Sequence, residues 1–438
     1  MQKKQSFIFS FLLLLACTKN KVTPKPAHTL CETRSEMRSC PQKHGKIFLP
    51  RTYTARAIYL GYSEDEYHKE FLELIIQQVK QLETRPMVNI LVPRTEDLFA
   101  YDHLVKYFAK KDYEFLNIIP TASNETIWAQ DYMEILFDTK TGFSQIVDLP
   151  YIGREGETIP ASIALSCQKE LIEQDEFKSG NIPGNGDYGG NIEPITPKIL
   201  TVGNNLTNET FNVLKASTSQ ELIDIDVQWL ETGHVDELLT TLPLKKDAGP
   251  CEQTLLVASP KLGLELIKKL PMTEKPAKNQ LMPFFDDYDN WPDLYHCLYP
   301  KNFKLKECLE LYRANETYQA HIDKSVESLQ LAINKHHQCR LKVESFPQIF
   351  VPLKKQKKYG EYTDRAIALN PNSVNNIFFY PTLILPKQIF PVFQEEVDKV
   401  LSQYPYKIIF ANGKFVHELN GGIHCATNIS YGCTPRAQ

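Results

Sequence analysis

The sequence lacks most of the features that assign a chain to a specialised class at first sight. Its 438 residues contain no low-complexity tract and no internal repeat strong enough to indicate a repeat architecture. Acidic and basic residues nearly balance, with a net charge of -4, so nothing in the composition favours nucleic acid as a partner. Ten cysteines are too dilute for a small disulfide scaffold, although their number fits an exported protein. A hydrophobic content of 42% is ample for a large packed core.

The apolar run near the N-terminus, residues 7–16, follows two lysines and is too short to span a bilayer as a helix. It ends in Leu14-Leu-Ala-Cys17, which resembles a bacterial lipoprotein cleavage site. We therefore expect residues 1–17 to be a lipoprotein signal peptide with Cys17 lipidated. The mature protein would then be anchored in the cell envelope, at the outer membrane or cell surface, without spanning the membrane. An ordinary signal peptide is the alternative.

The rest of the chain divides into a tether and one α/β domain. Residues 18–50 are rich in Lys, Pro, Ser and Thr and are expected to form a flexible tether. In residues 51–438, strand and helix patterns alternate, with an irregular segment at 271–315 that we interpret as a surface insertion. Strands are expected at residues 57–60, 88–92, 115–119, 199–203, 254–259, 348–351, 377–380 and 407–410. Helices are expected at residues 96–110, 322–335 and 390–403, and after a capping box formed by Ser63 and Glu66.

Three stretches carry candidate reactive residues. They are Trp128-Ala-Gln-Asp131, Gly233-His-Val-Asp-Glu237 and Asn420-Gly-Gly-Ile-His-Cys-Ala-Thr-Asn428. The last places Cys425 after a glycine pair, where a turn can expose the thiol. His234 and Asp236 are two apart, so an extended backbone would direct both to one face. Each stretch alone is weak evidence for a functional site, since a single buried histidine is usually structural. A further glycine-dense segment, residues 184–197, taken alone favours a plain turn.

Together these residues fit chemistry on a guanidinium group. Asp131 and Asp236 can hold the planar cation, because its donors match carboxylate geometry. The thiolate of Cys425 then attacks the central carbon, and His234 donates a proton to the departing amine and later takes one from water. The Trp128 ring can stack on the cation.

Four ordered motifs resemble the catalytic domain of the protein-arginine deiminases. They are Trp128-Ala-Gln-Asp-Tyr-Met-Glu134, Gly190-Asn-Ile-Glu193, Trp229-Leu-Glu-Thr-Gly-His-Val-Asp-Glu237 and His424-Cys-Ala-Thr-Asn428, within a similarity over roughly residues 55–432. The resemblance implies a five-bladed α/β propeller, the pentein fold. It also implies hydrolysis of peptidyl-arginine to peptidyl-citrulline and ammonia through a thiouronium on Cys425. Gly190, Thr232 and Arg154 are further candidates for contact with the arginine-containing peptide or protein.

The resemblance also implies a calcium ion. Its ligands would be the side chains of Gln130, Glu134 and Glu193 with the backbone carbonyls of Gly189 and Ile192. A second site is doubtful, because Asp148 matches a ligand but Tyr132 and Leu149 replace an acid and a serine. Gly422 stands where the family motif has Glu. One catalytic calcium is therefore expected, and Cys425 is expected to be competent only when that site is filled.

Two other functions stay open. One is a deiminase or amidinotransferase for free arginine or agmatine, because related folds share the His, Asp and Cys set. The other is an inactive surface lipoprotein that binds arginine-rich partners. The remaining cysteines, Cys433 among them, suit disulfides in an exported protein, but the sequence does not assign their pairing.

Overall fold

The computed structural model describes most of the expected domain and a short piece before it. The described residues are 31–33, 45–93, 114–121, 127–150, 158–173, 185–269, 297–298, 302, 305–352, 365–417, 419 and 421–433. Among them, no helix combines the length and the apolar character that a membrane crossing requires. The lipidation residue Cys17, the substrate candidate Arg154 and the expected helix at 96–110 lie outside these ranges.

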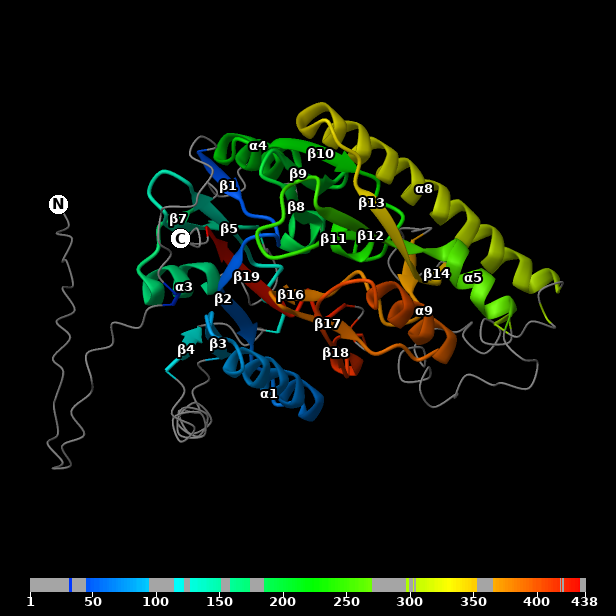
Figure 1. Ribbon diagram of the computed structural model, residues 1–438, viewed down its shortest axis with the longest axis horizontal. Helices are drawn as coiled ribbons and strands as arrows, with labels where there is room; N and C mark the ends of the chain where they lie inside the picture. Colours follow the sequence, from blue (N-terminus) through cyan, green and yellow to red (C-terminus); the bar gives the residue numbers. More distant parts are fainter. Residues whose placement is uncertain are drawn as a thin grey trace, which may run out of the picture.

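Five sheets of three or four strands form the body of the protein (Figure 1). The first is β1 (Lys46–Phe48), β5 (Met133–Asp138), β6 (Ser144–Asp148) and β7 (Leu171–Ile172). The second is β10 (Glu221–Ile225), β9 (Ile199–Gly203) and β8 (Ile192–Thr196). The third is β11 (Leu239–Pro243), β12 (Gln253–Ser259) and β13 (Lys342–Pro347). The fourth is β16 (Ile377–Phe379), β17 (Thr382–Pro386) and β18 (Lys407–Ala411), and the fifth is β19 (Thr427–Gly432), β2 (Thr54–Gly61), β3 (Met87–Pro93) and β4 (Leu116–Thr121).

The sheets share one plan, in which an antiparallel pair is extended by a parallel strand. Thus β8 runs antiparallel to β9 and β9 parallel to β10, and the same order recurs in β11–β12–β13 and β16–β17–β18. A parallel neighbour needs a crossover, and the crossovers within the described residues contain helix. The crossover helices are α1 (Glu66–Lys80), α3 (Ile159–Cys167), α4 (Asn208–Ser217), α5 (Pro260–Lys268), α8 (Lys306–His337) and α9 (Pro391–Leu401). Five such units confirm the predicted five-bladed α/β fold.

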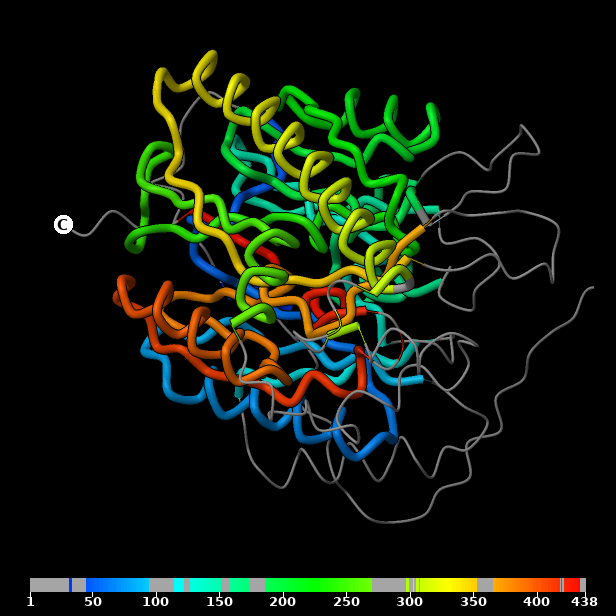
Figure 2. The backbone as a smooth tube through the Cα atoms, turned by 90° about the vertical axis from the view of Figure 1, so that its right-hand side faces the viewer, coloured from blue at the N-terminus to red at the C-terminus, as the bar shows by residue number. Residues whose placement is uncertain are grey.

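The helices lie on the outside of the blades, and the longest, α8, runs along one side of the molecule (Figures 1 and 2). The ring closes at β19, which pairs antiparallel with β2 from Thr427 opposite Leu60 to Gly432 opposite Thr54. The chain therefore completes its first blade with its last strand. A further two-stranded sheet, β14 (Phe350–Pro352) with β15 (Ala366–Ala368), and the short helix α10 (Lys414–His417) complete the described strands and α-helices.

Several predicted boundaries were wrong. Helix α1 is capped by Asp65, whose side chain accepts a hydrogen bond from the His68 amide, and not by a capping box at Ser63. The Ser63 hydroxyl instead accepts from the amide of Asp65 at 3.2 Å. Helix α8 begins at Lys306, so the last ten residues of the predicted insertion at 271–315 are helical.

The segment predicted as a flexible tether is partly ordered. Cys31 is disulfide-bonded to Cys167. Glu32 is buried against the Lys169 ammonium at 2.7 Å and the Arg56 guanidinium at 3.4 Å. These contacts hold residues 31–33 against the domain, and composition alone does not reveal them.

Most of the described cysteines are disulfide-bonded. Cys251 is bonded to Cys339 and Cys297 to Cys308, and Cys433 is disulfide-bonded as well. Among the described cysteines, Cys425 alone is a free thiol.

Candidate active site

The candidate residues lie in five turns, each of which leads into a strand of one blade's antiparallel pair. They are Asp131 before β5, Gly190 before β8, Asp236 before β11, Asn375 before β16 and Cys425 before β19. Because each of these turns precedes the corresponding strand of its blade's antiparallel pair, the propeller plan brings the turns together at the centre. The predicted grouping of Asp131, His234, Asp236 and Cys425 follows from this plan.

Hydrogen bonds join the turns to one another. The Gln130 amide donates to the Cys425 carbonyl at 3.1 Å, and the Gly189 amide donates to the Asp131 carbonyl at 3.2 Å. On the other side, the Asn375 side-chain oxygen accepts from the His424 amide at 2.8 Å. These links fix the turns relative to one another, two of them through backbone groups alone and one through the Asn375 side chain.

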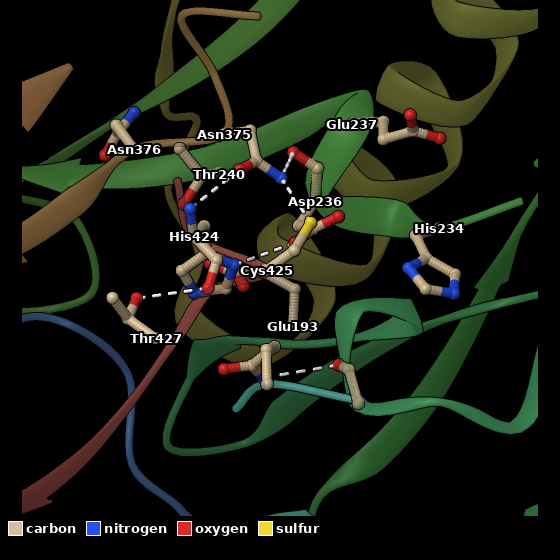
Figure 3. Close-up of polar contacts among 12 residues, drawn as sticks. Glu193, His234, Asp236, Glu237, Thr240, Asn375, Asn376, His424, Cys425 and Thr427 are labelled. Carbon is tan, nitrogen blue, oxygen red and sulfur yellow. Dashed lines mark hydrogen bonds and ion pairs between the residues drawn. The ribbon is translucent and has the colours of Figure 1, made fainter. Parts of the chain in front are cut away.

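The Cys425 thiol is 3% exposed and lies between two polar partners (Figure 3). The Asn375 amide donates to Sγ at 3.3 Å, and Sγ lies 3.6 Å from Oδ2 of Asp236. Burial, followed by the charges of Asp236 and Asp131, raises the pKa of the thiol well above its ordinary value of 9.0. The Asn375 amide and a backbone hydrogen bond oppose this shift only in part. Without a bound cation, the site therefore favours the protonated thiol.

Asp236 is fully buried, and its two oxygens differ in their contacts. Oδ2 lies 2.8 Å from Nδ1 of His424 and faces the thiol. Oδ1 has no hydrogen-bond partner within the described part of the chain. A buried carboxylate oxygen without a partner is costly, so its position beside a free thiol indicates a site for a cationic donor group.

His234 lies across the site from His424, with the Cys425 thiol between them in Figure 3. Its Nδ1 is 4.0 Å from Oδ1 of Asp131. The ring packs on Gly190, where a Cβ atom would lie 2.5 Å from that nitrogen, so any larger residue would displace it. His234 itself is extended, but Val235–Glu237 form a single 3-10 turn. The expectation that His234 and Asp236 share a face of an extended segment was therefore wrong.

Comparison with known proteins identifies the family. A sequence model of the protein-arginine deiminase (PAD) family matches residues 190–433, which is more than half of the chain. The chain belongs to the protein-arginine deiminase family. Protein-arginine deiminase type-1 of Homo sapiens is 25% identical over 381 residues, covering 79% of this chain and 53% of that protein. Type-3 of Mus musculus is 24% identical over 386 residues with the same coverage, so the chain spans about half the length of these curated relatives.

Solved structures confirm the pentein fold. The superposition on agmatine deiminase of C. jejuni covers 90% of this chain and 98% of that protein's chain, with a TM-score of 0.51 at 14% identity. Agmatine deiminase of Enterococcus faecalis covers 91% and 100%, with a TM-score of 0.52 at 12% identity. At such identities the likeness shows the fold alone.

The other substrate candidates lie around this centre. The Trp128 ring is buried against Gly421, and its backbone amide donates to the Tyr132 hydroxyl at 3.0 Å. Thr232 lies in the turn before His234 and is half-buried. Asn375 occupies the side-chain space of Gly422: a Cβ atom there would lie 2.0 Å from the Asn375 oxygen.

Most of the residues assigned to calcium do come together, in a pocket of about 40 Å³ that His424 also lines. It is lined by Gln130, Glu134, Ile192 and Glu193, among others, and the Gln130 amide nitrogen donates to Glu134 at 2.6 Å and to the Gly189 carbonyl at 3.4 Å. Burial, together with the charge of Glu193, raises the pKa of Glu134 well above its ordinary value.

As these side chains lie, they do not fit a calcium ion. Oε1 of Glu193 accepts from the Thr240 hydroxyl at 2.8 Å and lies 3.2 Å from Nε of Arg51, and Gln130 presents a donor to Glu134. Within the described ranges, no group of three or more His, Cys, Asp or Glu side chains is arranged to hold a metal. Asp148 ends β6 and does not line this pocket, while Tyr132 and Leu149 are buried in the core. The calcium requirement stays a prediction.

Sequence reasoning missed two residues of this site. Asn375, which contacts the thiol, lies in none of the four motifs and was not assigned a role. Arg51 precedes the expected first strand and belongs to no motif. A signal for Asn375 does exist, because it takes the place in its blade that Asp131 and Cys425 take in theirs.

Proposed function

We propose that the protein hydrolyses the guanidino group of arginine residues in peptides or proteins, giving citrulline residues and ammonia. The observation that supports this most directly is the unpartnered, buried Oδ1 of Asp236 beside the only free thiol among the described cysteines. Asp131 supplies a second carboxylate near His234. Two carboxylates can hold a guanidinium by paired hydrogen bonds while the thiol faces its carbon.

The proposed reaction has two halves. With the guanidinium held by Asp131 and Asp236, the Cys425 sulfur forms a bond to the guanidino carbon, and a carbon–nitrogen bond then breaks as His234 donates a proton to the leaving ammonia. Water next adds to the thiouronium carbon, with His234 accepting its proton, and the carbon–sulfur bond breaks to release the ureido product. His234 thus regains in the second half the proton that it gives up in the first.

The bound cation also activates the nucleophile. The charges that raise the pKa of the thiol are those of Asp236 and Asp131. A guanidinium between them offsets both charges and therefore favours the thiolate, whose proton passes to His234 and is the one that His234 then donates to the leaving ammonia. The site is thus expected to form its nucleophile when a cationic substrate arrives.

A second candidate is deimination of a small guanidine compound. The solved structures of the same fold include proteins named agmatine deiminase, and the guanidinium-binding set described above does not depend on whether the guanidino group belongs to a peptide or to a small molecule. An inactive arginine-binding protein is a third possibility. The lipid anchor at Cys17 stays a prediction, because that residue lies outside the described ranges.

One experiment separates these functions. Ammonia and ureido product are measured with a blocked arginine peptide, free arginine and agmatine, each with calcium and with excess chelator, and with Cys425→Ala as the control. The proposal expects turnover of the peptide above that of the two small compounds and none with Cys425→Ala. Preference for free arginine or agmatine supports the second function. No turnover of any compound in any condition overturns deimination.

A further inference from the structure

Arg51 is a buried cation at the back of the active site, in the segment between β1 and β2. It is 3% exposed, and its Nε lies 3.2 Å from Oε1 of Glu193. Its Nη1 donates to both the backbone carbonyl and the side-chain oxygen of Asn376, at 2.8 and 2.9 Å. Three polar contacts on two blades therefore hold one guanidinium in place.

Both partners of Arg51 adjoin catalytic turns. Glu193 lies in β8, three residues after Gly190, on which His234 packs. Asn376 is next to Asn375, whose amide donates to the Cys425 sulfur. Arg51 thus connects the turn that supports the proton-transfer histidine with the turn that contacts the nucleophile. A shift of either turn would misplace a reacting group.

The same place is where the resemblance puts calcium. Glu193 is one of the three side chains assigned to that ion, and Arg51 lines the same pocket as Gln130 and Glu134. A guanidinium carries a permanent charge and bonds carboxylate and carbonyl oxygens, which are also the ligands that calcium prefers. The pocket therefore already contains a cation that belongs to the chain.

We propose that Arg51 is a positioning residue that replaces calcium, so that the catalytic turns are ordered without a metal. This inference rests on the proposed function, but its first test does not. Calorimetry and thermal unfolding of the wild type, with excess chelator and with about 1 mM calcium, measure binding without any substrate. We expect no stoichiometric heat and no change in Tm. Stoichiometric binding that raises the Tm of the wild type overturns the proposal.

The variant Arg51→Gln provides the converse test. It frees Glu193 for other ligands, so calcium should now bind and raise the Tm by about 2–4 °C or more. The matched control is Arg56→Gln, which removes another buried arginine whose carboxylate partner is Glu32, away from this pocket. Both variants are expected to unfold at lower temperature than the wild type, but only Arg51→Gln should respond to calcium. Equal responses would overturn a specific role for Arg51.

The last test measures kcat, and it applies only if the wild type turns over a substrate. The wild type should work equally well with chelator and with calcium, whereas Arg51→Gln should lose about 100-fold in kcat with chelator and recover part of it with calcium. Arg51→Lys keeps the charge but not the planar arrangement of donors. Its kcat with chelator should therefore lie between those of the wild type and Arg51→Gln. A wild type that is active only with calcium, or an Arg51→Gln variant as active as wild type in chelator, overturns the proposal. If no form is active, the binding experiments still decide it.

Discussion

At the scale of single residues, the carboxylates around Cys425, which we propose bind the substrate, disfavour the thiolate while no cation is bound. Asp236 and Asp131 raise the pKa of the thiol, and the Asn375 amide lowers it only in part. This arrangement is the reverse of the electropositive surroundings that usually make a cysteine reactive. Reactivity toward a neutral reagent should therefore be poor, whereas reactivity toward a cationic one should be high.

The first prediction is the pH dependence of alkylation of Cys425. Because its pKa lies above 9.0, the thiolate fraction increases as pH rises, so the rate with neutral iodoacetamide should keep increasing through pH 9. A haloacetamidine, which carries a cation like that of the substrate, should react faster at pH 7. Mass spectrometry of the modified protein over time measures both rates. A plateau with iodoacetamide below pH 7 would contradict the expected environment.

Sequence reasoning found the residues that lie in motifs and missed those that do not. Asp131, His234, Asp236 and Cys425 each have recognisable neighbours, and the structure brings all four to one centre. Arg51 acts through its position in three dimensions, 142 residues before Glu193 in the chain, and its neighbours in sequence reveal nothing of that contact. The backbone conformation at Asp236 was also predicted wrongly. An extended segment directs residues two apart to the same face, but Val235–Glu237 form a 3-10 turn, which does not.

At the scale of elements, the alternation of strands and helices was predictable, but the repeated unit was not. Strands such as β9 and β12 were predicted to within a residue or two, because continuous apolar runs indicate buried strands. The crossovers differ greatly, from the 9 residues of α3 to the 32 of α8, so the five units have no common length. Without a constant period, the sequence shows no repeat although the fold does.

The second prediction concerns the short helix α10, which ends at His417, a few residues before the cysteine turn. Burial lowers the pKa of His417 to about 4 from its ordinary 6.5, although a contact with the Leu369 carbonyl opposes the shift. In the unfolded chain His417 is protonated below about pH 6.5, whereas in the folded protein it is protonated only below about pH 4. The free energy of unfolding should therefore fall as pH drops through that interval, by about 3 kcal/mol for this group.

Urea unfolding at pH 7 and pH 4.5 measures this effect, with His417→Gln as the test variant. The variant should lose less stability on acidification than the wild type does. His68, in α1, stacks on Phe415 of α10, and burial lowers its pKa to about 4 as well. Part of the pH dependence of the unfolding free energy should therefore remain in the variant. Identical slopes for wild type and His417→Gln would show that His417 does not titrate as described.

At the scale of the whole molecule, distant parts of the chain close the ring. The last strand, β19, completes the blade that begins with β2, and the ordered piece at residues 31–33 packs against both. Glu32 receives hydrogen bonds from Ser430 of β19 and Ser144 of β6, and the Asn89 side chain donates to the Cys31 carbonyl at 2.9 Å. The Cys31–Cys167 disulfide fastens this piece to the residue that ends α3. Closure thus depends on contacts between residues that are far apart in the sequence.

The third prediction rests on the length of the chain that this disulfide encloses. Cys31 and Cys167 are 136 residues apart, whereas Cys297 and Cys308 are 11 apart. Loop entropy in the unfolded chain grows with the logarithm of loop length, so the pair Cys31→Ser, Cys167→Ser should cost about 2 kcal/mol more than Cys297→Ser, Cys308→Ser. Neither pair touches the catalytic turns, so alkylation of Cys425 in the folded state should keep its wild-type rate. Unfolding by denaturant compares the two variants, and equal losses would mean that the disulfide at Cys31 acts through local contacts and not through closure of the ring.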